Sequence, residues 1–418
     1  MALVIDGIER IENQLCDRCL GRLFGKLGHG FNNETRGRAI RYALKNNIYT
    51  MNEEDIIQYS ELSAQRKECA LCKNLFDEIE NFAELIVEKL KHYEFNTFLI
   101  GSKVDKEITD KEEELWKEFG LSYAEPIKTE INREVGKIVS SKIGKEADFK
   151  APEITAIIDT RYDYVEVISS PLFIYGRYRK LVRDIPQTKW PCKRCFGKGC
   201  EYCNFKGKIY SSSVEEIIAG RVMEITKGEA HKLHGLGRED VDARVLGSGR
   251  PFILEIKAPK NRFVDLAKLE QEINKLGKDC VEISELRFTN FKEVVEIKGS
   301  KAPKIYRVEL EFEAPIDEQK IKELESRFSN LSILQRTPLR VAHRRADKVR
   351  ERKVLELKVE SAKPTSAKLL IKCEAGLYIK ELVTGDEDRT KPSIAELLGK
   401  KAWVKELDVV GVEYGKSF

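Results

Sequence analysis

The sequence predicts an α+β protein: a mixed, largely antiparallel sheet in the C-terminal half, preceded by a smaller α/β domain. Two observations support this fold class. Residues 210–418 are rich in apolar strands, with helices placed between neighbouring hairpins. Residues 76–190 alternate helical and strand patterns. A chain of 418 residues is too long for one ordinary core, so two or three domains are expected.

The N-terminal half contains two predicted regions. Residues 1–75 form a segment with two cysteine pairs around a basic, helix-like stretch, Glu34–Lys45. Residues 76–190 form the α/β domain, for which apolar spacing predicts helices, and β-branched and aromatic residues predict strands. The helices are expected over 79–92 and 128–145, and the strands over 97–100, 154–160, 162–169 and 172–177.

A compact cysteine-rich link at 191–210 precedes the C-terminal domain, residues 211–418. Ser213 and Glu216 have the spacing of a capping box and predict the start of a helix. Beyond it, helices are expected over 263–276 and 317–328, and strands over 252–256, 294–298, 305–312, 354–359 and 369–373.

Charge is unevenly distributed along the chain. The formal net charge is only +4, but residues 51–130 carry 10 basic and 20 acidic side chains, whereas residues 176–210 carry 10 basic and 2 acidic ones. Residues 331–360 are also basic, with 9 against 4. Such stretches suit a polyanionic partner, although charged runs are also common on solvated faces. Because no apolar run reaches the roughly 18 residues of a membrane span, we expect a soluble, cytoplasmic protein.

Eight of the ten cysteines fall in Cys-x-x-Cys pairs. Two such pairs supply the four thiolates that Zn²⁺ binds tetrahedrally, and a closed four-cysteine site is structural rather than catalytic. The sequence therefore predicts one or two structural zinc sites, with reduced thiols or a redox pair as the alternative. The ligands would be Cys16, Cys19, Cys69 and Cys72 in the first set, and Cys192, Cys195, Cys200 and Cys203 in the second.

The run from Gly237 to Arg244 crowds carboxylates and arginines into a glycine-framed turn just before a predicted strand. From the charge pattern alone, a surface network of ion pairs is the more frequent outcome. A carboxylate beside arginine also stays ionised at neutral pH, as a nucleophile or base requires.

The sequence Gly237-Arg238-Glu239-Asp240-Val241-Asp242, with Gly249-Arg250-Pro251-Phe252 after it, is similar to the aspartate motif of the Pus-ten family of tRNA pseudouridine synthases. The resemblance implies that Asp240 is the catalytic carboxylate, with Asp242 as the alternative. It also implies that Arg238 contributes to substrate binding.

Two further stretches resemble motifs of that family. Tyr306, in Lys304-Ile305-Tyr306, stands where the family has a tyrosine that stacks on the target uracil. Gly376-Leu377-Tyr378-Ile379-Lys380 resembles the third motif, which implies that Tyr378, Ile379 and Lys380 bind substrate and that Lys380 pairs with the aspartate. Many relatives carry arginine there, and lysine lacks its bidentate fork. Without the family, Tyr306 and Tyr378 would be packing residues and Lys380 a surface lysine.

Residues 76–190 resemble a THUMP domain, an RNA-binding module of tRNA-modifying enzymes, and the basic segment 335–353 also resembles the Pus-ten family. The resemblance implies isomerisation of uridines 54 and 55 in the T-loop of tRNA. It implies tRNA as partner, no obligatory protein partner and no redox or nucleotide cofactor. The alternatives are a non-catalytic zinc and tRNA-binding module or another THUMP enzyme, such as a methyltransferase or thiouridine synthetase.

Overall fold

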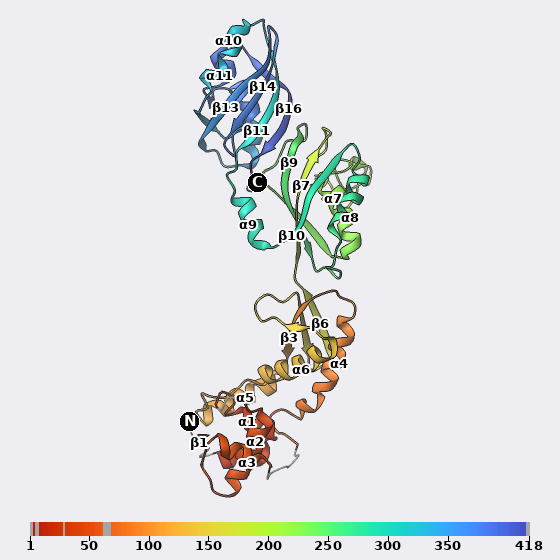
Figure 1. Cartoon of the computed structure of the whole chain (residues 1–418), viewed down its shortest axis with the longest axis vertical. Helices are drawn as coiled ribbons and strands as arrows, with labels where there is room; N and C mark the ends of the chain where they lie inside the picture. Colours follow the sequence, from red (N-terminus) through yellow and green to blue (C-terminus); the bar gives the residue numbers. More distant parts are fainter. Residues whose placement is uncertain (1–2, 5–7, 28–29, 62–67, 415–418) are drawn as a thin grey trace. The chain divides into compact units, whose positions relative to one another are not determined.

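We describe a computed structural model of the chain, which covers residues 3–4, 8–27, 30–61 and 68–414. The chain divides into two compact units, Met1–Ser170 and Pro171–Phe418, whose elements are labelled in Figure 1. No helix within the described ranges is both long and apolar enough to span a membrane.

The first unit combines a helical cluster with a four-stranded sheet of order β4-β3-β5-β6. Strands β3 and β5 are parallel, and β5 and β6 are antiparallel. Helices α4 and α6 pack on this sheet through Phe82, Ile86, Ile131 and Val135, all buried. The helices are α1 (Asp17–Arg22), α2 (Asn33–Lys45), α3 (Glu53–Glu61), α4 (Ile79–Leu90), α5 (Lys106–Glu118) and α6 (Ile127–Ile143). The strands are β1 (Leu3–Val4), β2 (Thr50–Met51), β3 (Thr97–Lys103), β4 (Glu146–Ala147), β5 (Ile154–Asp159) and β6 (Tyr164–Ser169).

The second unit is built on one long mixed sheet of order β10-β7-β9-β16-β11-β14-β13-β12-β15, with β8 paired to β9. Its strands are β7 (Leu172–Lys180), β8 (Ala230–Gly235), β9 (Arg244–Lys257), β10 (Val281–Thr289), β11 (Lys304–Phe312), β12 (Leu331–Arg336), β13 (Val349–Lys363), β14 (Ser366–Cys373), β15 (Thr390–Lys391) and β16 (Ala402–Val412). Its helices are α7 (Val214–Thr226), α8 (Leu266–Leu276), α9 (Phe291–Gly299), α10 (Glu318–Lys322), α11 (Leu324–Arg327), α12 (Ile379–Thr384) and α13 (Ile394–Leu398), with a 3-10 helix at Leu339–Arg344.

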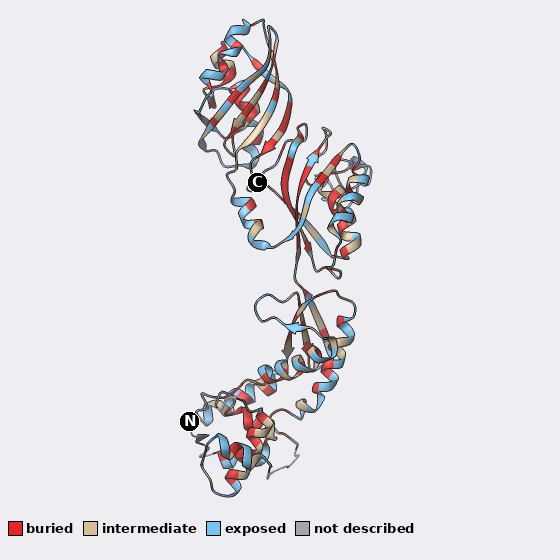
Figure 2. Cartoon of the chain, in the orientation of Figure 1, coloured by how far each residue is buried: buried red, intermediate tan, exposed pale blue. Residues whose placement is uncertain are grey.

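The sheet of the second unit carries two separate hydrophobic cores. One core lies between helices α7, α8 and α9 and strands β7 to β10. The other lies between helices α10 to α13 and strands β11 to β14. Buried residues run along the strands and the inner sides of the covering helices (Figure 2). Tyr306 on β11 packs against both cores, so it marks the region where they meet.

The two halves of the sheet are joined by a short parallel pairing of β9 with β16, at Arg244–Asp408 and Val245–Val409. Asp408 forms ion pairs of 2.7 Å with Arg244 and 2.9 Å with Arg183 at this junction. Every other pairing in the sheet of the described second unit is antiparallel. The predicted α+β class with a largely antiparallel sheet is therefore confirmed.

The predicted strand over 294–298 is wrong, because these residues lie in helix α9. Asn290 caps this helix by accepting hydrogen bonds from the backbone N–H groups of Lys292 and Glu293. Val294 and Ile297 are buried and Val295 is 57% exposed, which is helical rather than alternating spacing. The short run of β-branched residues suggested a strand, but the cap and the one-sided core decide for a helix.

Two other predicted elements differ in extent. The helix expected over 317–328 is two short helices, α10 and α11, which meet at Glu323. The strand expected near 172–177 extends to Lys180 and pairs with β9 and β10, so it belongs to the second unit's sheet. Residues 171–190 thus lie in the second unit, whereas we expected them to end the 76–190 domain. The capping box at Ser213 does begin helix α7.

Candidate active site

The loop between β8 and β9 carries Asp240 into a pocket of the second unit. Gly237 takes a backbone φ of 79°, a left-handed conformation that a side chain disfavours. The N–H of Ala243 donates to the carbonyl oxygen of Asp240 at 3.1 Å and closes the turn. The Asp240 side chain is 34% exposed, so its carboxylate remains accessible from the pocket.

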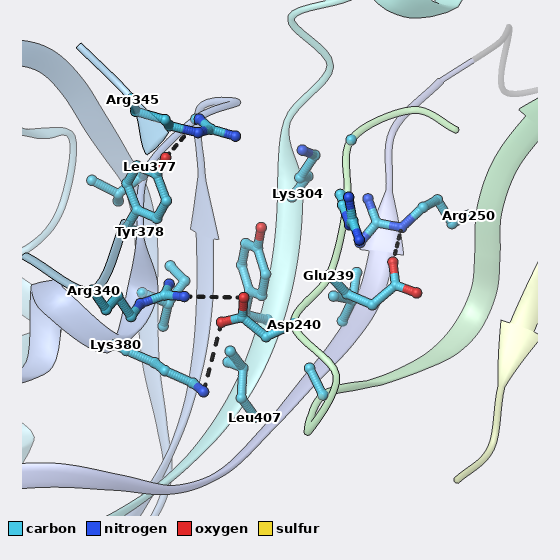
Figure 3. A pocket seen from close by; sticks show the side chains of 17 residues that line it. Glu239, Asp240, Arg250, Lys304, Arg340, Arg345, Leu377, Tyr378, Lys380 and Leu407 are labelled. Atoms are coloured by element: carbon cyan, nitrogen blue, oxygen red, sulfur yellow. Dashed lines mark hydrogen bonds and ion pairs between the residues drawn. The ribbon is translucent and has the colours of Figure 1, made fainter. Parts of the chain in front are cut away.

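Two cations flank the Asp240 carboxylate (Figure 3). One carboxylate oxygen lies 3.1 Å from Nη1 of Arg340, and the other lies 3.6 Å from Nζ of Lys380. Lys380 sits closer to Asp242, at 2.7 Å, and thus bridges two carboxylates. Burial raises the pKa of Asp242, but the Lys380 ammonium outweighs burial and holds that pKa below its ordinary value. Asp242 therefore stays ionised beside Lys380.

A second pocket wall comes from the central strands β11 and β16. Lys304 and Tyr306 line the pocket from β11, and Leu407 and Val409 line it from β16. Burial raises the pKa of Tyr306 above its ordinary value, so its hydroxyl keeps its proton at neutral pH. Aromatic and aliphatic side chains thus face a carboxylate across one cavity, as a site for a planar polar base requires.

The side-chain ammonium of Lys304, on β11, forms no hydrogen bond or ion pair with any other described residue. Burial lowers its pKa to about 8, and the guanidinium of Arg250 adds to that effect. A Cβ on Gly237 would lie 2.5 Å from Nζ of Lys304, so a side chain there would displace the end of this lysine. Lys304 therefore presents an unpaired ammonium to the pocket.

The Asp240 loop is supported from behind by a buried polar network. Glu239 lies next to Asp240, but its carboxylate is directed away from that of Asp240 and forms a 2.9 Å ion pair with Arg250, each side chain being 1% exposed (Figure 3). Tyr178 donates its hydroxyl hydrogen to Glu239 at 2.8 Å, and Gln187 donates to the Tyr178 oxygen at 2.8 Å and to the Gly237 carbonyl at 3.1 Å.

The network continues through Lys180, whose ammonium donates to the carbonyl oxygens of Ile185 and Val241 at 2.8 and 2.9 Å. Burial lowers the pKa of Lys180 from its ordinary value. The loop that presents Asp240 is therefore fixed on its inner side by charged groups from β7 and β9.

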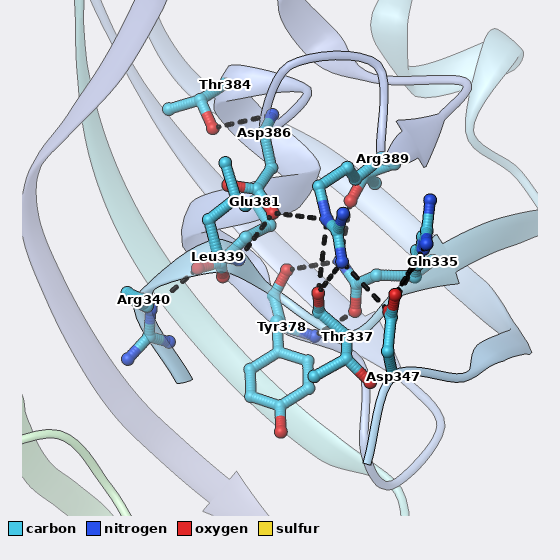
Figure 4. Close-up of polar contacts among 12 residues, drawn as sticks. Gln335, Thr337, Leu339, Arg340, Asp347, Tyr378, Glu381, Thr384, Asp386 and Arg389 are labelled. Carbon is cyan, nitrogen blue, oxygen red and sulfur yellow. Dashed lines mark hydrogen bonds and ion pairs between the residues drawn. The ribbon is translucent and has the colours of Figure 1, made fainter. Parts of the chain in front are cut away.

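The opposite side of the pocket is held by contacts around Tyr378 (Figure 4). The side-chain amide of Gln335 donates to the Tyr378 carbonyl at 3.0 Å, and its oxygen accepts from the Tyr378 N–H at 2.8 Å. Arg340 donates from Nε to Glu381 at 2.6 Å while its Nη1 meets Asp240. Arg345 donates to the Tyr378 hydroxyl at 2.7 Å. These contacts attach the loop after β12 to helix α12.

All six residues that the sequence motifs indicated for catalysis and substrate binding line this one pocket: Arg238, Asp240, Tyr306, Tyr378, Ile379 and Lys380. They come from segments up to 142 residues apart in the sequence (238 to 380). Their roles stay predictions. Arg340 was expected only as part of a phosphate-binding segment, yet it contacts the Asp240 carboxylate. Lys304, Glu239 and Tyr178 were assigned no role of their own, although Lys304 and Glu239 stand in the quoted motifs, because their contacts depend on the fold.

The cysteine pairs come together as two clusters, in each of which all four sulfur atoms lie within 4.8 Å of one another. Cys16 and Cys72 have their sulfurs 3.8 Å apart, and the second cluster has S···S distances of 3.7–3.8 Å. Four thiolates around one zinc ion at about 2.3 Å stand about 3.8 Å apart. Each cluster could therefore hold a metal ion, although the first pairs are 49 residues apart in the chain.

Two family models match the chain. The model described as "Pus10, C-terminal" matches residues 173–413, and "Pus10 THUMP domain, archaeal" matches residues 82–159. The first match covers more than half of the chain and includes every residue lining the pocket.

Curated relatives named tRNA pseudouridine synthase Pus10 are similar over nearly the whole chain, and three of them serve as examples. The protein of Methanothrix thermoacetophila is 40% identical, covering 95% of this chain and 91% of its own. That of Methanopyrus kandleri is 41% identical, covering 94% of each, and that of Methanocaldococcus jannaschii is 43% identical, covering 95% and 92%. A solved Cbf5–Nop10–Gar1 complex matches with a TM-score of 0.31 at 18% identity, over 57% of this chain and 48% of that one, which is too low to support an argument.

Proposed function

The chain belongs to the Pus10 family of tRNA pseudouridine synthases, and we propose that it isomerises uridine to pseudouridine in tRNA with Asp240 as the catalytic carboxylate. The observation that supports Asp240 most strongly is its accessible carboxylate, held between Arg340 and Lys380 in a pocket lined by Tyr306. The other two carboxylates of the loop are less suited to the role. Glu239 is buried in an ion pair with Arg250, and Asp242 lies closer to Lys380 than Asp240 does.

The reaction only rearranges bonds within one nucleotide. The bond between ribose C1′ and uracil N1 breaks, the base turns, and C5 bonds to C1′. The proton leaves C5 and N1 gains one, so no electron or group enters. Asp240 attacks or deprotonates the ribose, and the two cations beside its carboxylate hold it in place. The target uridine must leave its stack to reach this carboxylate.

The remaining pocket residues have binding roles in this proposal. Tyr306 packs against the detached uracil, and Tyr378 and Ile379 form the other side of the base pocket. Arg238, exposed at the pocket rim, contacts the RNA backbone. The motif resemblance supports uridines 54 and 55 of the T-loop as targets.

We assign zinc to the two cysteine clusters as structural metal. Their sulfur spacing fits a tetrahedral thiolate site, and four thiolates leave no open position for catalysis. Metal analysis should find about two zinc ions per chain, and a metal-free, folded protein would contradict this assignment.

The Asp240→Asn substitution tests the catalytic role. The amide keeps the shape of the side chain but removes its charge, so tRNA binding should persist while pseudouridine formation on unmodified tRNA is abolished. Asp242→Asn is the matched control, because it removes the neighbouring carboxylate and leaves Asp240 between its cations. Product formed by the Asp240→Asn protein, detected by chemical labelling of pseudouridine, would move the role elsewhere.

A further inference from the structure

The second cysteine cluster sits in a short finger, residues 191–208, whose surface is both aromatic and cationic. Three aromatic side chains are strongly exposed there: Phe196 by 83%, Phe205 by 75% and Tyr202 by 62%. These three aromatic side chains lie within ten residues of one another in the chain, and grouped exposed apolar side chains mark interaction sites more often than scattered ones do. They make no contribution to the described cores of the second unit.

Both phenylalanines of the finger have a backbone conformation that bulky side chains disfavour. Phe196 has φ 51° and Phe205 has φ 58°, both in the left-handed region. Glycine or asparagine fits such turns, and a bulky side chain is an outlier there. Gly197, Gly199 and Gly207 also take positive φ, so the tight turns of the finger are already served by glycine. An aromatic side chain at two strained, exposed positions indicates a role outside folding.

The charge of the finger is complementary to a polyanion. It holds five basic residues against one acidic residue, Glu201. Lys208 pairs with Glu216 at 2.7 Å, whereas Lys193, Arg194, Lys198 and Lys206 are exposed and form no ion pair with any described residue. The Arg194 guanidinium lies 4.2 Å from the centre of the Tyr202 ring, a stacked pair of the kind that also receives nucleic-acid bases.

The base of the finger reaches the candidate active site. Trp190 and Ile209 pair through their backbones at 3.0 Å, and the Trp190 ring meets Tyr210 edge-on at 5.5 Å. The guanidinium of Arg238 lies 5.4 Å from the Trp190 ring centre. Trp190 and Arg238 line a cavity together with Asp240. A chain held by the finger would therefore continue towards the catalytic carboxylate.

We propose that the finger of residues 191–208 is a stacking platform for unpaired nucleotides of the RNA substrate. Phe196 and Phe205 stack on exposed bases, and the four unpaired cations contact the phosphates between them. This proposal rests on the proposed function for the identity of the RNA. Stacking is indifferent to base sequence, so the platform adds affinity and leads the strand to the pocket without choosing the target uridine.

The test is the double substitution Phe196→Leu, Phe205→Leu, with tRNA binding measured by filter retention. Leucine keeps apolar bulk but loses the aromatic face, so the dissociation constant for unmodified tRNA should rise roughly tenfold or more. The pair Phe196→Tyr, Phe205→Tyr keeps the rings and should bind as the unchanged protein does. Phe291→Leu, at a 62% exposed phenylalanine on α9, is the matched control elsewhere in the unit. Metal content confirms that each variant keeps its finger.

Two outcomes overturn the platform. Binding of the leucine variant within twofold of the unchanged protein shows that the rings do not hold RNA. An equal loss in the leucine and tyrosine variants shows that the change lies in the finger's fold. The rate of pseudouridine formation by the leucine variant at saturating tRNA is measured in parallel, and this rate should stay near that of the unchanged protein. If the unchanged protein makes no pseudouridine, the proposed function fails, and the binding comparison still decides the platform.

Discussion

Replacing Glu239 by alanine should destabilise the second unit far more than removal of any exposed carboxylate. Glu239 and Arg250 form a 2.9 Å ion pair in which each side chain is only 1% exposed. Alanine would leave the Arg250 charge buried without its carboxylate, although the Leu236 carbonyl, 2.7 Å from Nη1, would still accept from it. It would also remove the acceptor of the Tyr178 hydroxyl.

The magnitude follows from this geometry. Breaking a buried ion pair by removing one partner costs about 3–5 kcal/mol, because the remaining charge stays desolvated. For a unit of this size, each kcal/mol corresponds to about 2–4 °C in Tm, so a fall of about 6–20 °C is expected. Glu239→Gln retains an oxygen acceptor and should lose less. Glu360→Ala breaks a 2.8 Å pair with Arg307, whose side chain is 48% exposed, and should cost about 0–1 kcal/mol.

Tryptophan fluorescence can report the second unit alone. Trp116 lies in the first unit, and Trp190 and Trp403 lie in the second. In a Trp116→Phe background, urea unfolding followed by fluorescence therefore gives the free energy of unfolding of the second unit for each variant. A loss below about 1 kcal/mol for Glu239→Ala, no greater than that of Glu360→Ala, would refute the claim that this buried pair holds the Asp240 loop.

Three further outcomes are expected. Lys380→Met should lower the single-turnover rate of pseudouridine formation by roughly 10²-fold with little change in tRNA affinity. Lys380→Arg keeps the positive charge and should retain most of the rate. Equal rates for the two variants and the unchanged protein would contradict a role for the charge of Lys380. Lys304→Met should stabilise the protein at pH 7 by up to roughly 3 kcal/mol, because the folded chain then no longer buries an ammonium. This gain should shrink as pH rises from about 8 towards 10.5, where the unfolded chain keeps a proton that the folded chain has lost. Urea unfolding at pH 7 and pH 10 measures the gain, and a gain independent of pH would contradict the prediction. Cys72→Ser should release one metal ion per chain and shift the Trp116 fluorescence transition to lower urea, because Cys72 is fully buried in the first unit's core; unchanged metal content would contradict a metal site there.

Local patterns in the sequence predicted most elements because they depend on neighbouring residues. The capping box at Ser213 and the apolar spacing of α4 and α6 act within a few turns of chain. The exception at α9 arose where the β-branched residues Val294, Val295 and Ile297 suit either conformation, and the Asn290 cap decided it. The place of β7 could not be predicted, because its partners β9 and β10 begin 72 and 109 residues beyond its own start (172 to 244 and 281).

The residues of the candidate site also fall into two groups: those that short sequence motifs predict and those that only the fold brings together. Asp240 and Lys380 stand in motifs that are recognisable as short strings, and the structure brings both to one pocket. Arg250 also stands in a quoted motif, but its support of the Asp240 loop, like that of Tyr178, could not be predicted, because it depends on burial against Glu239. Burial is a property of the packed sheet and leaves no local signature in the chain. The cysteine clusters needed no such context, since Cys-x-x-Cys spacing already presents two sulfurs to one ion.

Lys380 alone cannot fix the orientation of the Asp240 carboxylate, and Arg340 provides the second contact. A lysine offers a point charge and cannot grip a carboxylate with two parallel hydrogen bonds. Here Lys380 divides its charge between Asp240 at 3.6 Å and Asp242 at 2.7 Å, which by itself would orient Asp240 weakly. Arg340 supplies the missing direction: its Nε is fixed by Glu381, and its Nη1 then points at Asp240 from a defined angle. Position and charge at this carboxylate thus come from two different residues, which lie on separate segments of the chain.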